Sequence, residues 1–230
     1  LYQRNSLTDI IKKTAKNIFI PITVGGGLRT LDDINTVLRA GADKVSINTA
    51  AINNPDFITE ASRVFGSSTI VIAIEAIKQP DNSYLAYTDN GREYTGVDAI
   101  AWAKEVEERG AGEILLTSID KEGTGDGFDT ELIKKISNVV TIPVIGHGGA
   151  ANESHISDSI KDSGADAVAI ASMLHYAALN KNGSIMGKYD NEGNTEFLKK
   201  NNSFKMFGKE NIADMKEKLL DRNIPLRVLN

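Results

Sequence analysis

IPITVGGG at residues 20–27 is nearly repeated as IPVIGHGG at residues 142–149. Each copy is followed by a helical stretch that ends at Gly-Ala-Asp, at residues 41–43 and 164–166, before a short apolar strand. A repeat of about 120 residues is too long for a solenoid unit and is about half of a large α/β barrel. The sequence therefore predicts two half-barrels, each carrying one glycine-rich site.

Short apolar, β-branched runs alternate with amphipathic stretches along the whole chain. This alternation is typical of repeated βα units around a buried parallel sheet. Asp89-Asn90-Gly91 separates two further strand-like runs, Ser83–Thr88 and Arg92–Thr95, and so predicts an inserted β-hairpin. Strands are predicted near 20–24, 45–48, 69–75, 113–117, 142–146 and 167–170, and helices at roughly 7–16, 31–39, 55–64, 97–109, 130–137, 153–162 and 209–222.

The predicted parallel strands are two fewer than a closed (β/α)8 TIM barrel needs. We interpret residues 1–230 as one α/β domain, a TIM barrel of two half-barrel repeats whose first two strands and first helix are missing at the amino end. An open doubly wound sheet is the alternative, which the half-barrel repeat disfavours. The polar, turn-rich segment 180–208 is expected to form an inserted loop before the last helix.

The overall composition excludes several classes of function. The chain is 41% hydrophobic and 25% charged, carries a net charge of −5 and contains no cysteine. The negative charge argues against a nucleic-acid partner, and the lack of cysteine removes disulfides, thiolate metal sites and a cysteine nucleophile. No apolar run approaches the ~18 residues of a membrane helix. We therefore expect a cytoplasmic protein with no membrane partner.

Glycine-rich turns after two predicted strands are the first candidate binding sites. Gly26 and Gly27 follow one strand, and Gly148 and Gly149 follow the corresponding strand of the second repeat. Glycine lets the backbone approach a ligand closely, and the N–H groups that open the next helix favour an anion. A single motif of this kind is equally explained as a tight βα turn. The second copy favours two phosphate sites, and so a ligand with a phosphate at each end.

Acidic residues follow two other predicted strands. Glu75 ends an otherwise apolar strand, and Asp120 and Glu122 precede the glycine-rich stretch 123–125. Catalytic groups of a TIM barrel occupy such strand ends, and a glycine-rich loop suits closure over a substrate. The alternative for Glu75 is that it merely begins a loop.

The three histidines do not indicate a metal site. His147, His155 and His175 lack the spacing of a zinc motif, so no metal is expected. His147 lies within the second glycine turn, where we interpret it as a structural residue.

Four stretches resemble the cyclase subunit of imidazole glycerol phosphate synthase, the HisF family of histidine biosynthesis: ITVGGGLR (22–29), GADKVSINTAA (41–51), ERGAGEILLTSIDKEGTGDGFD (108–129) and HGGA (147–150). The second and third stretches fit the sister isomerase poorly. The resemblance implies a (β/α)8 lyase without a cofactor, in a heterodimer with a glutaminase subunit. Ammonia from the glutaminase would cross the barrel to a bisphosphate ribulosyl-aminoimidazole substrate. The products would be imidazole glycerol phosphate and aminoimidazole carboxamide ribotide.

The resemblance also implies roles for individual residues. Glu75 would be the catalytic acid–base, and Lys44 and Glu113 would form the ammonia gate at the glutaminase-facing end. One phosphate would be held by Gly26, Gly27, Asn48 and Thr49, the other by Gly148, Gly149, Ala171 and Ser172, and the site would be lined by Thr117, Glu122 and Gly123.

Three departures from the family pattern leave other functions open. The family uses two catalytic aspartates, of which the first lies on a strand absent from this sequence and the second corresponds to Glu75. The extra methylene of glutamate shifts the carboxylate by about one carbon–carbon bond, a displacement that matters for positioned chemistry. Glu122 also replaces an aspartate. The alternatives are a divergent cyclase-like subunit that supplies ammonia to a sugar amidotransferase in surface-polysaccharide biosynthesis, a non-catalytic binding or scaffold role, and, last, the sister isomerase.

Overall fold

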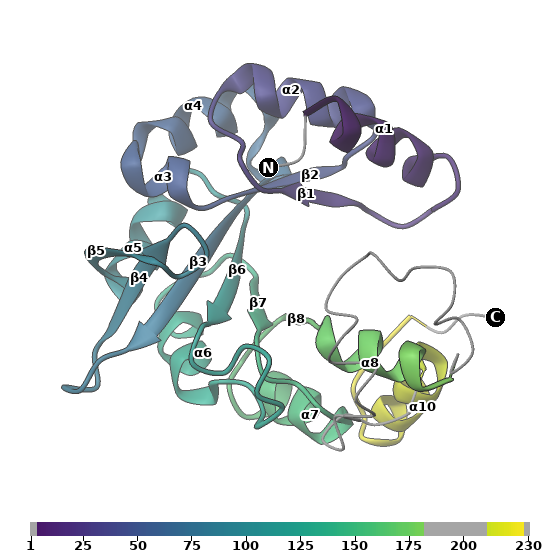
Figure 1. Ribbon diagram of the computed structural model, residues 1–230. Coiled ribbons are helices and arrows are strands. Elements are labelled where there is room, and N and C mark those ends of the chain that lie inside the picture. Colours follow the sequence, from purple (N-terminus) through teal and green to yellow (C-terminus); the bar gives the residue numbers. More distant parts are fainter. Residues whose placement is uncertain (1–3, 182–210, 228–230) are drawn as a thin grey trace.

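The computed structural model describes residues 4–181 and 211–227, which form a curled parallel sheet with helices on its outer side (Figure 1). The sheet order is β1-β2-β3-β6-β7-β8, and the hairpin of β4 and β5 pairs with β3. The strands are β1 (Thr23–Gly25), β2 (Lys44–Ile47), β3 (Ile70–Lys78), β4 (Tyr84–Thr88), β5 (Glu93–Asp98), β6 (Glu113–Ser118), β7 (Val144–His147) and β8 (Ala167–Ala169). The helices are α1 (Arg4–Ala15), α2 (Leu31–Ala40), α3 (Thr49–Asn53), α4 (Asp56–Phe65), α5 (Ala99–Glu108), α6 (Thr130–Ser137), α7 (Glu153–Lys161), α8 (Ser172–Lys181) and α10 (Ile212–Asp221), with a 3-10 turn at Ser67–Thr69.

The predicted fold class is confirmed. The alternating strands and helices build the wall of a (β/α)8 TIM barrel, and the six parallel strands of the described residues are fewer than the eight of a closed barrel. The core lies along β3, one of the two central strands, where Ile70, Ile72 and Ile74 are fully buried. Each such side chain stabilises the fold by roughly 1.5–3 kcal/mol relative to an exposed position.

The repeated Gly-Ala-Asp motif has a structural cause. Asp43 accepts a hydrogen bond at 2.7 Å from the backbone N–H of Ile22, and Asp166 accepts one at 2.9 Å from that of Val144. Each aspartate therefore ties the start of its own strand to the start of the preceding strand. Gly41 has a φ of 116° because the chain must leave α2 through a left-handed residue.

The predicted hairpin is confirmed, and it lies against the carboxyl end of β3. Asp89, Asn90 and Gly91 all have positive φ, between 52° and 77°, a conformation that Asp, Asn and Gly tolerate best. The hairpin pairs with Glu75–Lys78, the carboxyl half of β3. The neighbouring β2 ends at Ile47, and the hairpin continues the sheet from that point.

Two helices of the structure were not predicted. α3 begins at Thr49, separated by one residue from the end of β2, and α8 begins at Ser172, shortly after the end of β8. α8 lacks the apolar periodicity of an amphipathic helix. The expected loop 180–208 begins with the last two residues of α8, and its remainder lies outside the described residues. No helix in the described part of the chain is long and apolar enough to cross a membrane.

Candidate functional site

Three polar side chains form a row across the carboxyl ends of neighbouring strands. Glu75 of β3 is paired in register with Thr117 of β6, and Thr117 is paired with His147 of β7. Adjacent strands lie about 4.8 Å apart, so the row spans roughly 10 Å from Glu75 to His147. Residues in one register row point to the same face of a parallel sheet. This edge of the sheet is therefore the candidate functional site.

Glu75 is the carboxylic acid in that row, and its pKa is raised above the ordinary value. Burial raises the pKa of its carboxyl, and the nearby charges of Glu122 and Asp89 raise it further. Hydrogen bonding by Asn48 and the Gly91 N–H opposes the shift only in part. Its Oε2 atom is buried without a hydrogen-bond partner among the described residues. A carboxyl with a raised pKa at a strand end is suited to give and take a proton.

The first glycine site is open to solvent. Gly26 and Gly27 are exposed, and a Cβ atom on either would meet no heavy atom within 4 Å. Directly after the next strand, β2, Asn48 donates to the Tyr87 carbonyl at 3.1 Å. The hairpin is thus bound to the residue that follows β2, the strand next to β1, and the space next to the two glycines is free for a ligand.

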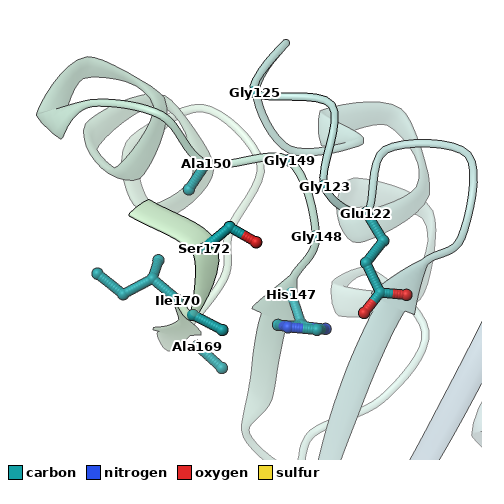
Figure 2. Close-up of a pocket in the computed structure, with 11 residues that line it drawn as sticks. Glu122, Gly123, Gly125, His147, Gly148, Gly149, Ala150, Ala169, Ile170 and Ser172 are labelled. Carbon is teal, nitrogen blue, oxygen red and sulfur yellow. The ribbon is translucent and has the colours of Figure 1, made fainter. Parts of the chain in front are cut away.

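The second glycine site is covered by the loop that follows β6. Gly148 and Gly149 are buried, and a Cβ on Gly149 would lie 2.1 Å from the carbonyl oxygen of Gly127. The site is a pocket of about 40 Å³, which at roughly 10–15 Å³ per water holds a group the size of a phosphate. Figure 2 shows its lining: Glu122, Gly123, Gly125, His147, Gly148, Gly149, Ala150, Ala169, Ile170, Ala171 and Ser172.

The structure brings most of the predicted site residues together at this edge, in two groups. In the first group, Gly26 and Gly27 follow β1, while Asn48 and Thr49 follow β2, with Thr49 as the first residue of α3. The second group lines the pocket beyond β7 and β8: Glu122, Gly123, Gly148, Gly149, Ala171 and Ser172. Asp120 has a structural contact, because its carboxylate accepts the backbone N–H of Lys78 at 2.8 Å.

The sequence did not assign five residues of the pocket lining to the site: Gly125, His147, Ala150, Ala169 and Ile170. Of these, His147 has a polar side chain. Its Nδ1 lies 3.0 Å from the Thr117 hydroxyl, and the ring lines the second pocket. The missed signal is the repeat itself, because His147 occupies the position that Gly25 has in the first copy.

Lys44 and Glu113 lie at the opposite end of the sheet. They begin β2 and β6, the strands on either side of β3, and form an ion pair across it. Their side chains are only 27% and 20% exposed. Among the described residues, no cluster of three His, Cys, Asp or Glu side chains could hold a metal ion.

Known proteins share much of this sequence. Residues 2–180 match the family described as "Histidine biosynthesis protein". The chain is 48% identical over 174 residues to imidazole glycerol phosphate synthase subunit HisF of Alkaliphilus metalliredigens, covering 76% of this chain and 69% of that protein. The corresponding subunit of a Hydrogenobaculum species is 51% identical over 178 residues (77% and 71%), and that of Methanococcus maripaludis is 46% identical over 194 residues (76% and 71%). The chain therefore belongs to the histidine biosynthesis protein family, among the HisF subunits of imidazole glycerol phosphate synthase.

Proposed function

We propose that the chain is the cyclase subunit of imidazole glycerol phosphate synthase, a lyase that works in the cytoplasm. It would use ammonia to convert a bisphosphate ribulosyl-aminoimidazole substrate into imidazole glycerol phosphate and aminoimidazole carboxamide ribotide. Membership of the HisF family supports this reaction over the sugar-amidotransferase alternative, because all three relatives described above are named imidazole glycerol phosphate synthase subunit HisF.

The observation that carries the proposal is the position of Glu75 between the two glycine sites. Glu75 is on β3, one of the two central strands, while the glycine sites follow β1 and β7 on either side. A ligand anchored at both sites by its phosphates would place its middle over Glu75 and Thr117. Phosphate contacts from Gly26, Gly27, Asn48 and Thr49 at one end, and from Gly148, Gly149, Ala171 and Ser172 at the other, are part of the proposal.

Glu75 would act as the general acid–base of ring closure. Burial and neighbouring carboxylates favour its neutral form, so it holds a proton at a higher pH than an exposed glutamate does. After giving that proton to the reacting ligand, the carboxylate becomes the base for the next step. Thr117, beside it in the row, would place a hydroxyl against the same part of the ligand.

Ammonia would enter from the amino ends of the strands. Lys44 and Glu113 bridge that end of β3 and would form the gate. Phe19, which precedes the amino end of β1, is 91% exposed and follows the exposed Ile18, an apolar surface of the kind that marks a protein–protein contact. We assign this end of the barrel to the glutaminase subunit of the heterodimer.

The test is turnover of the bisphosphate substrate with ammonium as the nitrogen donor, with imidazole glycerol phosphate measured by mass spectrometry. We expect the unaltered protein to form product and Glu75→Gln to lose about 10²–10⁴-fold in kcat, the range for loss of a general acid–base. Glu60→Gln is the matched control, because Glu60 is an exposed carboxylate on α4. Absence of turnover in the unaltered protein, or full activity in Glu75→Gln, would refute the proposal.

A further inference from the structure

The two repeats differ at one position that faces the site. Gly25 ends β1 and His147 ends β7 at the same place in the repeated sequence. Gly25 has no side chain, and a Cβ there would already lie 3.0 Å from the Cβ of Ser46. His147 is paired with Ala169 on β8, where the smaller neighbour leaves room for a ring. The second site thus contains a functional group that the first one lacks.

One nitrogen of the His147 imidazole lies within hydrogen-bond distance of the protein, and the other is available to a ligand. Nδ1 lies 3.0 Å from the hydroxyl of Thr117, which is only 7% exposed. Within the described residues, Nε2 makes no hydrogen bond to the protein. When Thr117 donates to Nδ1, the neutral ring carries its proton on Nε2. The ring is then an oriented donor with a free N–H.

The pocket around this ring needs such a donor. Figure 2 shows the imidazole at the base of the pocket, with Ser172 on one side and the carboxylate of Glu122 on the other. A carboxylate disfavours an anion in the same pocket, so the backbone N–H groups of the glycine turn have to be supplemented. Imidazole and hydroxyl groups are suitable additional donors for phosphoryl oxygens.

We propose that Nε2 of His147 binds a phosphoryl oxygen of the ligand in the second glycine site, with Thr117 as the positioning residue that fixes the ring. The class of ligand is a phosphate monoester, and its identity as one end of the bisphosphate substrate rests on the proposed function. Phosphate binding by the pocket itself does not depend on that function.

The test uses inorganic phosphate and the imidazole ¹⁵N signals of the folded protein. The chain has three histidines, so the signals of His147 are assigned by their loss in His147→Asn. We expect these signals to move saturably as phosphate is added, while those of His175, an exposed residue of α8, stay in place. Thr117→Val should change the ratio of the two neutral tautomers of His147, because it removes the hydroxyl beside Nδ1. Loss of a packing contact elsewhere on the ring would not change this ratio.

Affinity is then read from the backbone N–H signal of Gly149, which remains in every variant. We expect His147→Ala to weaken phosphate binding about tenfold, as for a lost hydrogen bond to a charged group. Thr117→Val should weaken it less, and His175→Asn should leave it unchanged. If the His147 signals stay still while the Gly149 signal reports binding, or if phosphate does not bind, the assignment is overturned.

Steady-state kinetics separates this role from proton transfer. Loss of a binding contact made equally in the ground and transition states raises KM and leaves kcat nearly unchanged, and this is the result expected for His147→Ala. A loss of kcat at constant KM would make His147 an acid–base group and overturn the proposal. If the unaltered protein shows no cyclase turnover, the proposed function fails, and the phosphate titration still decides the role of His147.

Discussion

Alanine substitutions at the site glycines should give a graded series of stability losses. Gly26, Gly148 and Gly149 have nearly equal φ values of 100°, 97° and 100°. An L side chain in left-handed backbone costs about 1–2 kcal/mol, which is reduced by about 0.4–1 kcal/mol through the smaller entropy of the unfolded chain. At Gly26, where the space is open, this backbone effect is the whole perturbation, so Gly26→Ala should lose about 1 kcal/mol of unfolding free energy.

The other two positions add a steric clash of increasing size. A Cβ on Gly148 would lie 2.8 Å from the Ser118 carbonyl oxygen, and one on Gly149 would lie 2.1 Å from the Gly127 carbonyl oxygen. Overpacking costs about 1–3 kcal/mol, so Gly148→Ala should lose about 2 kcal/mol. Gly149→Ala also strains the hydrogen bond from the Gly127 N–H to the Gly149 carbonyl, at 2.8 Å. That bond contributes about 1 kcal/mol, so the total loss should reach roughly 4 kcal/mol.

Urea unfolding followed by circular dichroism measures all three variants on one scale. For a chain of this size the losses correspond to falls in Tm of about 2–4 °C per kcal/mol. Equal losses in the three variants, within about 0.5 kcal/mol, would refute the reasoning, because the shared φ would then be the only source of the effect. Gly26→Ala should instead impair ligand binding, since its methyl group would enter the open first site.

Burial raises the pKa of Glu75 above its ordinary 4.5, so the folded state retains the proton longer and the unfolding free energy falls as pH rises between the two values. Glu75→Gln avoids that loss. The difference in unfolding free energy between Glu75→Gln and the unaltered protein, measured by urea unfolding, should therefore shift in favour of the variant as pH rises between the two pKa values and stay constant at higher pH. Lys44→Met should cost no more than about 1 kcal/mol in unfolding free energy, as for a partly exposed ion pair. It should alter glutamine-dependent turnover of the heterodimer more than ammonium-dependent turnover, and equal effects on both would argue against the gate. Phe19→Asp should weaken association with the glutaminase at least tenfold by calorimetry, whereas Val64→Asp, at a 60% exposed position on α4, should not.

The elements with a strong local signal could be predicted from the sequence. The hairpin follows from Asp89-Asn90-Gly91, whose residue types suit the left-handed backbone found there. The buried strand β3 follows from its continuous β-branched run. α8 was missed because its apolar residues follow no helical period, and its formation depends on the strand end from which it starts.

The sequence predicts where the site lies, but only some of the contacts around its residues. Strand ends identify Glu75 and the glycine turns, because parallel strands end at a common edge. Whether a glycine faces open space, as Gly26 does, or the carbonyl of another loop, as Gly149 does, depends on contacts between distant segments. The same limit applies to His147, whose partner Thr117 is 30 residues away in the chain.

The difference between the two glycine sites matters because a symmetric barrel could bind a bisphosphate ligand in two opposite orientations. Two equivalent phosphate sites would hold a bisphosphate in either orientation, and only one orientation presents the correct atom to Glu75. The first site is open beside the hairpin, and the second is closed by the loop after β6 and contains His147. Suppose that His147 strengthens the binding of one of the two phosphates tenfold and does not strengthen the binding of the other. The binding free energies of the two orientations then differ by as much as about 1.4 kcal/mol. The residues that break the repeat would then select the productive orientation, while the repeated residues supply binding at both ends.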